Sequence, residues 1–296
     1  MTAAARKPAM AERNIVEGEF AFTDDDFRRI AAMLHGDAGI ALPESKATLA
    51  YSRLAKRLRA LGLASFKEYC ALVASTEGAG ERQKMLAALT TNVTRFFREP
   101  HHFEHLREQV LPPLLAAARR GAPVRIWSAG CSSGQEPFST AMTILGMAPD
   151  AVELDIKILA SDIDPNMVEH GRQGVFPGQA LQEVPAAFRH RWFKPLGPGS
   201  DQVRAVDEVR ALISFRELNL IGQWPMKGRF DVIFCRNVVI YFEEDTQSRI
   251  WSRFTRLMSP GGVLYIGHSE RVTGPATAQL APDGITTYRL KSGAPA

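Results

Sequence analysis

Apolar runs alternate with helix-patterned segments through the second half of the chain, as in a parallel α/β sheet. The clearest run is 230–235, which enters from Asp231 and stops abruptly at Arg236 and Asn237. Continuous apolarity of this kind is typical of a strand that is buried on both faces. Ligands of open α/β sheets bind at the carboxyl ends of the strands, so Arg236 and Asn237 are predicted to face a ligand.

Other short runs predict further strands of the same sheet: residues 124–128, 156–160 and 263–267, with a closing strand over 285–290. Strands that alternate with helical segments favour a doubly wound, mostly parallel sheet. Residues 172–215 interrupt this rhythm with Gly, Pro and two short β-like pieces, 202–206 and 213–215. We therefore expect a small inserted β-subdomain over about 172–215.

The N-terminal part has helical periodicity instead. Thr23 is an N-cap candidate because three aspartates follow it in the first turn. Later helices are predicted over 43–61, 65–75 and 80–89. The predicted organisation is a disordered tail over 1–20, an all-helical domain over 21–90, a linker and helix over 91–121, and the sheet domain over 122–296.

Composition fits a cytoplasmic protein. The 296 residues are 45% hydrophobic, with no apolar N-terminal segment and no run approaching the ~18 residues that span a bilayer. Three scattered cysteines argue for reduced thiols rather than a disulfide framework. The net charge of +4 is a weak indication of an acidic partner.

The turn between the strand at 124–128 and the next helix carries Gly130 and Gly134. Glycines there allow a ligand to approach the backbone, although they also serve an ordinary tight turn. Asp162 follows the next strand and is placed to accept hydrogen bonds from ribose hydroxyls; the alternative is a helix N-cap, which Asp164 could fill equally well. A nucleoside cofactor is favoured. NAD and S-adenosylmethionine both fit, and the closing strand favours the seven-stranded methyltransferase variant.

Other candidate ligands have simpler explanations. Cys131 and Cys235 are interpreted as small buried core thiols. His101, His102 and His268 lack partners at metal-ligand spacing, so we assign no metal.

One predicted helix is strongly basic. Five positive charges and no acidic residue occur within fourteen positions: Lys46, Arg53, Lys56, Arg57 and Arg59. Arg53, Lys56 and Arg57 cluster on the face opposite the leucines. Either this is a solvated helix face or it is a docking surface for an acidic partner.

Several segments in the right order resemble the CheR family of chemotaxis-receptor glutamate methyltransferases. The matching segments are 90–103, 127–137, 159–164, 219–220, 230–242 and 267–270, within a match over about 22–290. Gln135 and Phe138 stand where that family commonly has Glu and Tyr.

The resemblance implies a Rossmann-like S-adenosylmethionine-dependent methyltransferase sheet with an N-terminal all-helical domain and a small inserted β-subdomain. It implies methyl esterification of glutamates on the cytoplasmic domains of chemotaxis receptors, with S-adenosylhomocysteine as product. The protein is expected to be a cytoplasmic monomer that is recruited to membrane receptor arrays. Binding of a receptor C-terminal tail at the β-subdomain is an open expectation.

By motif position, the resemblance also implies which residues form the site. The linker and helix over 91–121 are expected to contribute to the cofactor site. The implied cofactor contacts are Asn92, Thr94, Arg98, Glu136, Asp162, Asn219, Leu220, Arg236 and Asn237. Arg98 and Tyr241 are implied to face the transferred methyl group.

Two other classes of protein are alternatives to this interpretation. A nucleic-acid methyltransferase would use the basic helix to track phosphates, but the strand tip reads Cys-Arg-Asn-Val rather than Asn/Asp-Pro-Pro-Tyr/Phe. A signalling adaptor without turnover would not need the set of Asn92, Arg98, Asp162 and Tyr241. A glutamate carboxylate is already ionised at neutral pH and needs no general base, which agrees with strand tips that show no His–carboxylate pair.

Overall fold

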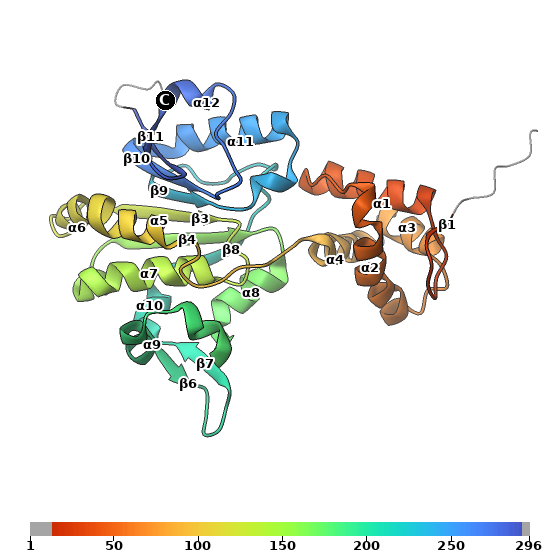
Figure 1. Cartoon of the computed structure of the whole chain (residues 1–296), viewed down its shortest axis with the longest axis horizontal. Coiled ribbons are helices and arrows are strands. Elements are labelled where there is room, and N and C mark those ends of the chain that lie inside the picture. The colour runs from red at the N-terminus through yellow and green to blue at the C-terminus, as the bar shows by residue number, and fades with distance from the viewer. Residues whose placement is uncertain (1–13, 292–296) are drawn as a thin grey trace, which may run out of the picture. The chain divides into compact units, whose positions relative to one another are not determined.

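The computed structural model describes residues 14–291 and divides the chain into two compact units, Met1–Thr90 and Thr91–Ala296 (Figure 1). The first unit is mainly helical. Its elements are β1 (Asn14–Val16), β2 (Phe22–Thr23), α1 (Asp24–Ala38), a 3₁₀ turn (Glu44–Lys46), α2 (Ala47–Leu61), α3 (Phe66–Ala74) and α4 (Ala79–Leu89).

Helix ends in this unit follow their capping residues. Thr23 Oγ1 accepts from the backbone N–H of Asp26 at 3.1 Å, and the Asp26 carboxylate accepts from the Thr23 N–H at 3.1 Å. This reciprocal capping box satisfies two orphan donors at the start of α1. Gly62 ends α2 with φ +66°, a left-handed conformation that favours glycine.

The predicted tail over 1–20 is wrong for residues 14–20, and residues 1–13 lie outside the described residues. β1 pairs antiparallel with β2, and Phe20 is buried. Phe22 packs on Phe66 with ring centroids 4.3 Å apart, and the Phe20 N–H donates to the Tyr51 hydroxyl at 3.1 Å. Pairing of β1 with β2 and burial of the Phe20 ring, whose centroid lies 6.4 Å from that of Phe66, order this segment, although its polar composition suggested disorder.

The second unit is built on a seven-stranded sheet in the order β11-β12-β10-β9-β3-β4-β8. Its strands are β3 (Val124–Ala129), β4 (Ile156–Asp162), β8 (Ile213–Glu217), β9 (Phe230–Cys235), β10 (Met258–Ile266), β11 (Leu280–Gly284) and β12 (Thr287–Leu290). β12 runs antiparallel to β10, whereas β8, β4, β3, β9 and β10 are mutually parallel. The predicted fold class is confirmed.

Helices cover both faces of this sheet. They are α5 (Pro100–His105), a π-helical segment (Leu106–Val110), α6 (Leu111–Ala118), α7 (Gln135–Met147), α8 (Pro165–Gln173), α10 (Asp207–Ala211), α11 (Glu244–Leu257) and α12 (Ala276–Gln279). Along β9, Val232 and Phe234 join the core beneath α5, α6 and α7, while Ile233 and Cys235 join the core beneath α11 (Figure 1). Because both faces of β9 are buried, its sequence is continuously apolar.

The inserted β-subdomain is smaller than predicted. A separate sheet in the order β5-β7-β6 contains β5 (Val175–Pro177), β6 (Phe193–Pro195) and β7 (Gln202–Ala205), accompanied by a 3₁₀ segment (Gly178–Glu183) and α9 (Ala186–Trp192). Residues 213–215 do not belong to it, because β8 pairs parallel with β4 at the edge of the main sheet. An edge strand buries little, so β8 lacks the apolar run of a central strand.

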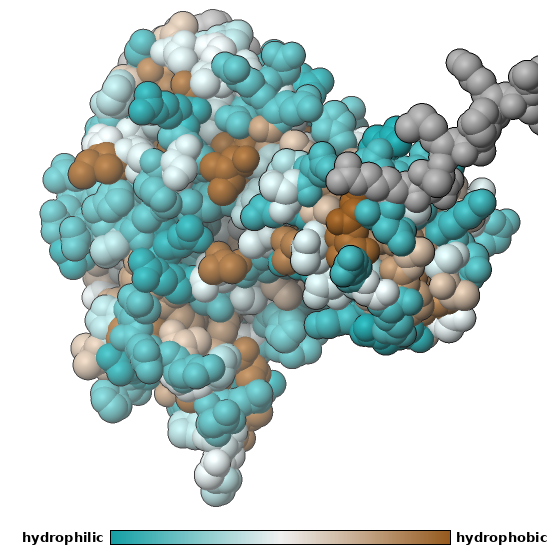
Figure 2. All heavy atoms as spheres, turned by 45° about the vertical axis from the view of Figure 1, so that its right-hand side comes forward, coloured by the Kyte–Doolittle hydropathy of each residue, from teal (hydrophilic) through white to brown (hydrophobic). Residues whose placement is uncertain are grey.

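No helix within residues 14–291 combines the length and apolarity needed to cross a lipid bilayer. On the face that Figure 2 shows, apolar atoms form separate small patches within a largely hydrophilic surface. The exposed large apolar side chains, such as Val93 and Ile285, are likewise scattered along the chain.

Candidate active site

The candidate site lies at the carboxyl edge of the sheet, where the strand order reverses. β4 and β9 flank β3 on opposite sides, so the chain leaves β3 at a topological switch point. Gly130 (φ +80°) and Gly134 (φ +101°) shape the turn that follows β3. A Cβ atom at Gly130 would collide with Val238 of the turn after β9, so glycine allows these two turns to pack closely.

The loop over residues 92–98 is fastened to this edge. Asn92 Nδ2 donates to Asp164 Oδ2 at 3.0 Å, and Ser132 Oγ donates to the Asn92 carbonyl at 2.9 Å. Phe96 is fully buried against Phe176 of β5 and Phe193 of β6. These contacts bring Asn92, far from the strand tips in sequence, beside them; Thr94, within the same loop, is half-buried.

Asp162 ends β4 as a buried carboxylate. Its Oδ2 accepts from the Ser132 N–H at 2.7 Å, and its Oδ1 accepts from the Asp164 N–H at 3.0 Å. Burial raises the pKa of Asp162, and these backbone donors oppose the rise. Asp164 is the residue that caps α8, through the Asn166 N–H at 2.9 Å. Asp162 is therefore not needed as the helix cap, and its oxygens retain acceptor capacity beyond these two bonds.

The predicted pair Asn219–Leu220 lies next to Asp162. The Leu218 N–H donates to the Asp162 carbonyl at 2.9 Å, which places the chain after β8 beside the tip of β4. Asn219 Oδ1 accepts from the Ile221 N–H at 3.1 Å. The Leu220 side chain is buried, and its carbonyl accepts from Arg253 Nη1 at 2.8 Å.

A second group surrounds Arg236 at the tip of β9. The Arg236 side chain is buried and donates to the Arg98 carbonyl oxygen. Its guanidinium also lies 3.4 Å from Glu136 and 3.5 Å from Glu99. Burial raises the pKa of Glu136, with Arg236 opposing the rise, and Ser128 Oγ donates to Glu136 at 2.6 Å. Arg236 thus links the predicted residues Arg98 and Glu136.

Glu270 clamps the turn after β9. Its carboxylate accepts from the backbone N–H groups of Asn237, Val238, Val239 and Gly267 at 2.6–2.9 Å. The carboxylate is buried, which raises the pKa of Glu270 against the opposing effect of these four donors. The clamp holds Asn237 at φ +59°. It also fixes the start of the 3₁₀ turn Val239–Tyr241, which carries the half-buried Tyr241.

Four non-glycine residues with left-handed backbones gather in these segments: Phe97, Glu99, Ser132 and Asn237, at φ +49° to +59°. Such conformations cost of order 1–3 kcal/mol each and persist where surrounding contacts over-determine them. Backbone strain concentrated at one edge of a sheet is typical of a binding site. Asn237 Oδ1 is also buried with no hydrogen-bond partner, so it is an acceptor available to a ligand.

A His–carboxylate pair does lie at the strand tips, contrary to the sequence-based expectation. His268 follows β10, and its Nδ1 lies 3.0 Å from Glu99 Oε1. Glu99 also went unrecognised, although it precedes Pro100 at the start of α5. Burial opposes ionisation of Glu99, but Arg236 and the hydrogen bonds from His268 outweigh it, so the pKa of Glu99 lies below its ordinary value. The pair was missed because the two residues are 169 positions apart in sequence.

Cys131 and Cys235 are free and buried, and burial raises the pKa of each thiol well above its ordinary value. Protonated thiols are poor nucleophiles. Their predicted role as core side chains agrees with this environment.

The basic helix α2 uses two of its three predicted docking residues internally. Arg57 forms two hydrogen bonds to the buried Glu81, at 2.8 and 2.7 Å, and Glu81 also accepts from the Tyr69 hydroxyl at 3.2 Å. Arg53 Nη1 donates to the carbonyls of Ala88 and Thr90 at the end of α4. Lys56 is exposed. Arg53 and Arg57 therefore join α2 to α4. Of the three predicted docking residues, Lys56 is the one that can be either solvated or in contact with an acidic partner.

Comparison with known families assigns both units. Residues 25–90 match the CheR methyltransferase all-alpha domain, and residues 92–286 match the CheR methyltransferase SAM-binding domain. The second match contains every residue that we predicted to contact the cofactor.

Individual relatives agree over most of the chain. The chain is 56% identical over 258 residues to a probable chemotaxis protein methyltransferase of Rhizobium etli, covering 87% of this chain and 96% of that one. It is 44% identical to chemotaxis protein methyltransferase 2 of Pseudomonas aeruginosa, covering 85% and 88%. It is 42% identical to the chemotaxis protein methyltransferase of Escherichia coli, covering 91% and 92%. The chain belongs to the CheR family of S-adenosylmethionine-dependent chemotaxis protein methyltransferases.

Proposed function

We propose that the chain esterifies glutamate side chains of chemoreceptors with the methyl group of S-adenosylmethionine, using the site at the tips of β3, β4 and β9. The observation that carries the residue assignment is the Arg236 group, which joins Arg98 from the 92–98 loop to Glu136 at the start of α7. These segments are distant in sequence, and each belongs to a motif of the family resemblance.

The residues at this edge suit the cofactor chemically. Asp162 offers carboxylate acceptors for ribose hydroxyls, and the unpartnered Asn237 Oδ1 is a further buried acceptor. The close approach of the turns at Gly130 and Val238 requires a residue without a Cβ. Asn92, Thr94, Asn219 and Leu220 complete the proposed binding set.

When bound, S-adenosylmethionine supplies an electrophilic methyl group. A glutamate carboxylate has a reference pKa of about 4.3, so it is ionised at neutral pH and needs no base. The His268–Glu99 pair is accordingly assigned to holding Arg236 rather than to proton removal. Arg98 positions the incoming carboxylate through its planar fork of donors, and Tyr241 orients one of its oxygens. Orientation of reacting groups can supply roughly 7–11 kcal/mol of the barrier.

Methyl transfer to receptor fragments, compared with transfer to RNA, tests this substrate class. We expect radiolabel from methyl-labelled cofactor to appear in the receptor fragment and not in RNA. Label in RNA alone would favour a nucleic-acid methyltransferase, and the absence of transfer to either would favour an adaptor that has lost turnover.

Receptor docking is proposed to involve the exposed basic face of α2. Lys56→Glu is expected to raise the receptor KM by about two- to tenfold, since exposed charge pairs contribute roughly 0.2–1 kcal/mol and reversal adds repulsion. Cofactor KM should stay constant, and the receptor effect should shrink at high salt because exposed charges are screened.

Arg57→Glu is the matched variant, because it places a second carboxylate against the buried Glu81. We expect it to lower the melting temperature, which Lys56→Glu should not do. A receptor KM that is unchanged in Lys56→Glu at low salt would leave α2 as a solvated face.

The β5-β7-β6 sheet is proposed as a weak site for a receptor C-terminal tail. β7 is its central strand, so an added strand would pair with the edge strand β5 or β6. Each edge strand ends in a proline, Pro177 or Pro195, which cannot donate to a ladder. We therefore expect weak tethering, with methylation of receptors that lack the tail largely retained. Titration with a tail peptide checks this, and micromolar or tighter binding would contradict it.

A further inference from the structure

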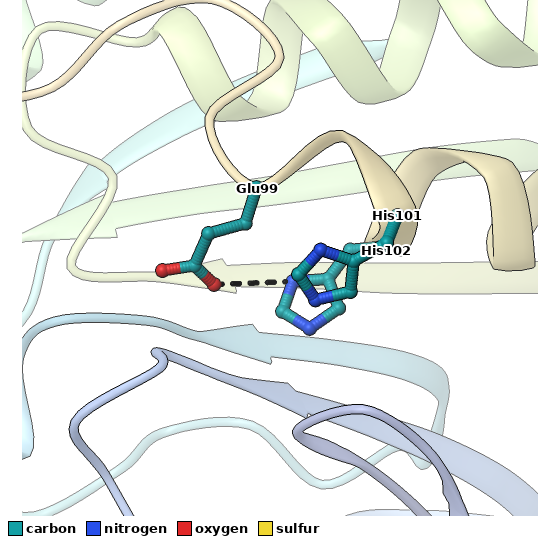
Figure 3. A group of neighbouring side chains, drawn as sticks. All are labelled: Glu99, His101 and His102. Carbon is teal, nitrogen blue, oxygen red and sulfur yellow. Dashed lines mark ion pairs between the residues drawn. The ribbon is translucent and has the colours of Figure 1, made fainter.

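Three buried ligand-type atoms converge at the start of α5 without hydrogen-bond partners: Glu99 Oε2, His101 Nε2 and His102 Nδ1. These three side chains could hold a metal ion, because each offers one ligand atom and the three atoms all lie within 4.8 Å of one another. Figure 3 shows the Glu99 carboxylate and the two imidazole rings side by side. Buried polar atoms are rarely left unpaired, so three at one place mark a candidate ligand site.

The tautomer of His102 is fixed by its other nitrogen. Nε2 lies 2.8 Å from Thr286 Oγ1 and 3.2 Å from the Ile285 carbonyl. Thr286 Oγ1 itself donates to that same carbonyl at 2.8 Å, so both partners of Nε2 act as acceptors. Nε2 therefore carries the ring hydrogen, and Nδ1 presents a lone pair. A metal-binding imidazole has this arrangement, in which the second nitrogen donates to an outer acceptor.

Glu99 is oriented in the same way. His268 donates from its backbone N–H and approaches with its ring nitrogen at Oε1, at 3.3 and 3.0 Å. The other oxygen, Oε2, faces His102 Nδ1 at 3.5 Å. Two ligands of a tetrahedral Zn²⁺ at about 2.0–2.1 Å lie about 3.3–3.4 Å apart. The spacing of Oε2 and Nδ1 is close to that value.

Arg236 is the cation next to this group. Its Nη2 lies 3.5 Å from Glu99 Oε2, and its Nη1 lies 3.4 Å from Glu136 Oε2. The contact with Glu99 Oε2 is an ion pair without a hydrogen bond, so a metal ion would not have to displace one.

We propose that Glu99, His101 and His102 form a Zn²⁺ site with an open fourth position. Two imidazoles and one carboxylate are a ligand set that Zn²⁺ accepts. His101 is half-buried, and its ring centroid lies 4.2 Å from that of His102. A small movement of the His101 side chain would complete the site. Zn²⁺ would bind Glu99, which also lies 3.5 Å from Arg236. A bound metal ion is therefore positioned to modulate the methyltransferase site.

Direct metal binding tests this site. The full-length, tag-free protein is stripped with a chelator, and its affinity for Zn²⁺ is measured by competition with a chromophoric chelator. Co²⁺ serves as a spectroscopic probe of tetrahedral nitrogen and oxygen ligation. We expect one Zn²⁺ to bind per chain. The Zn²⁺ affinity of His101→Gln should be lower by at least ~10–100-fold, which is the effect of losing a hydrogen-bond partner of a metal ligand.

His190→Gln is the matched control, because His190 is exposed on α9. It should bind Zn²⁺ as the parent protein does. Glu99→Gln provides a second variant that keeps the side-chain volume and should also lose affinity. Equal Zn²⁺ affinity in His101→Gln and the parent, or no binding by the parent at micromolar Zn²⁺, would overturn the proposal and leave a buried water as the occupant.

Discussion

Asp162→Ala is expected to weaken binding of S-adenosylhomocysteine by about 30- to 700-fold. Loss of hydrogen bonds from a charged carboxylate to both ribose hydroxyls should cost about 2–4 kcal/mol, because each such bond is worth roughly 1.5–3 kcal/mol and water in the space left by the carboxylate recovers part of the total. The substitution also releases the Ser132 and Asp164 N–H groups that Asp162 now holds at 2.7 and 3.0 Å. Calorimetric titration measures the change.

Glu169→Ala removes an exposed carboxylate of α8 and is the control for a general loss of charge. Circular dichroism checks that the sheet domain of each variant is folded. Unchanged affinity in a folded Asp162→Ala protein would remove Asp162 from the cofactor site.

Arg98→Lys is expected to lower turnover at saturating cofactor by about 10- to 150-fold. Lysine keeps the charge but loses the planar fork, and a hydrogen bond to a charged group is worth about 1.5–3 kcal/mol. The backbone carbonyl of Arg98, which accepts from Arg236, is unaffected by the substitution. Cofactor affinity should therefore change less than turnover.

Tyr241→Phe supplies a second measurement of the same role. It should reduce turnover with a modest effect on cofactor affinity, because the 3₁₀ turn that carries Tyr241 is held by Glu270 through backbone N–H groups. Parental turnover in both variants would contradict the assignment of Arg98 and Tyr241 to carboxylate positioning.

The sequence predicted those parts of the fold that local chemistry determines. Thr23 starts α1, and Gly62 ends α2, because capping depends on residues close in sequence. β9 was found over 230–235 because burial on both faces leaves a continuous apolar run. The alternative roles of Asp162 and Asp164 were also visible in sequence, but only the structure shows that Asp164 caps α8.

Partners far apart in sequence could not be predicted in this way. Arg57 and Glu81 are 24 positions apart, and their pairing converts an apparently solvated charge into an internal contact. The Glu270 clamp crosses more than thirty positions to reach the turn after β9. β8 was assigned to the wrong sheet because an edge strand has a weak apolar signal. Each case depends on tertiary contact, which hydrophobic periodicity does not encode.

The product proposed for this site is a glutamate methyl ester on a chemoreceptor. The protein is incubated with methyl-labelled S-adenosylmethionine and the cytoplasmic fragment of a receptor from the same genome, and the product is treated with base. We predict release of the label as volatile methanol, together with its loss when the methylated receptor glutamates are replaced by alanine. Label that resists base, or that remains after those replacements, would contradict the claim.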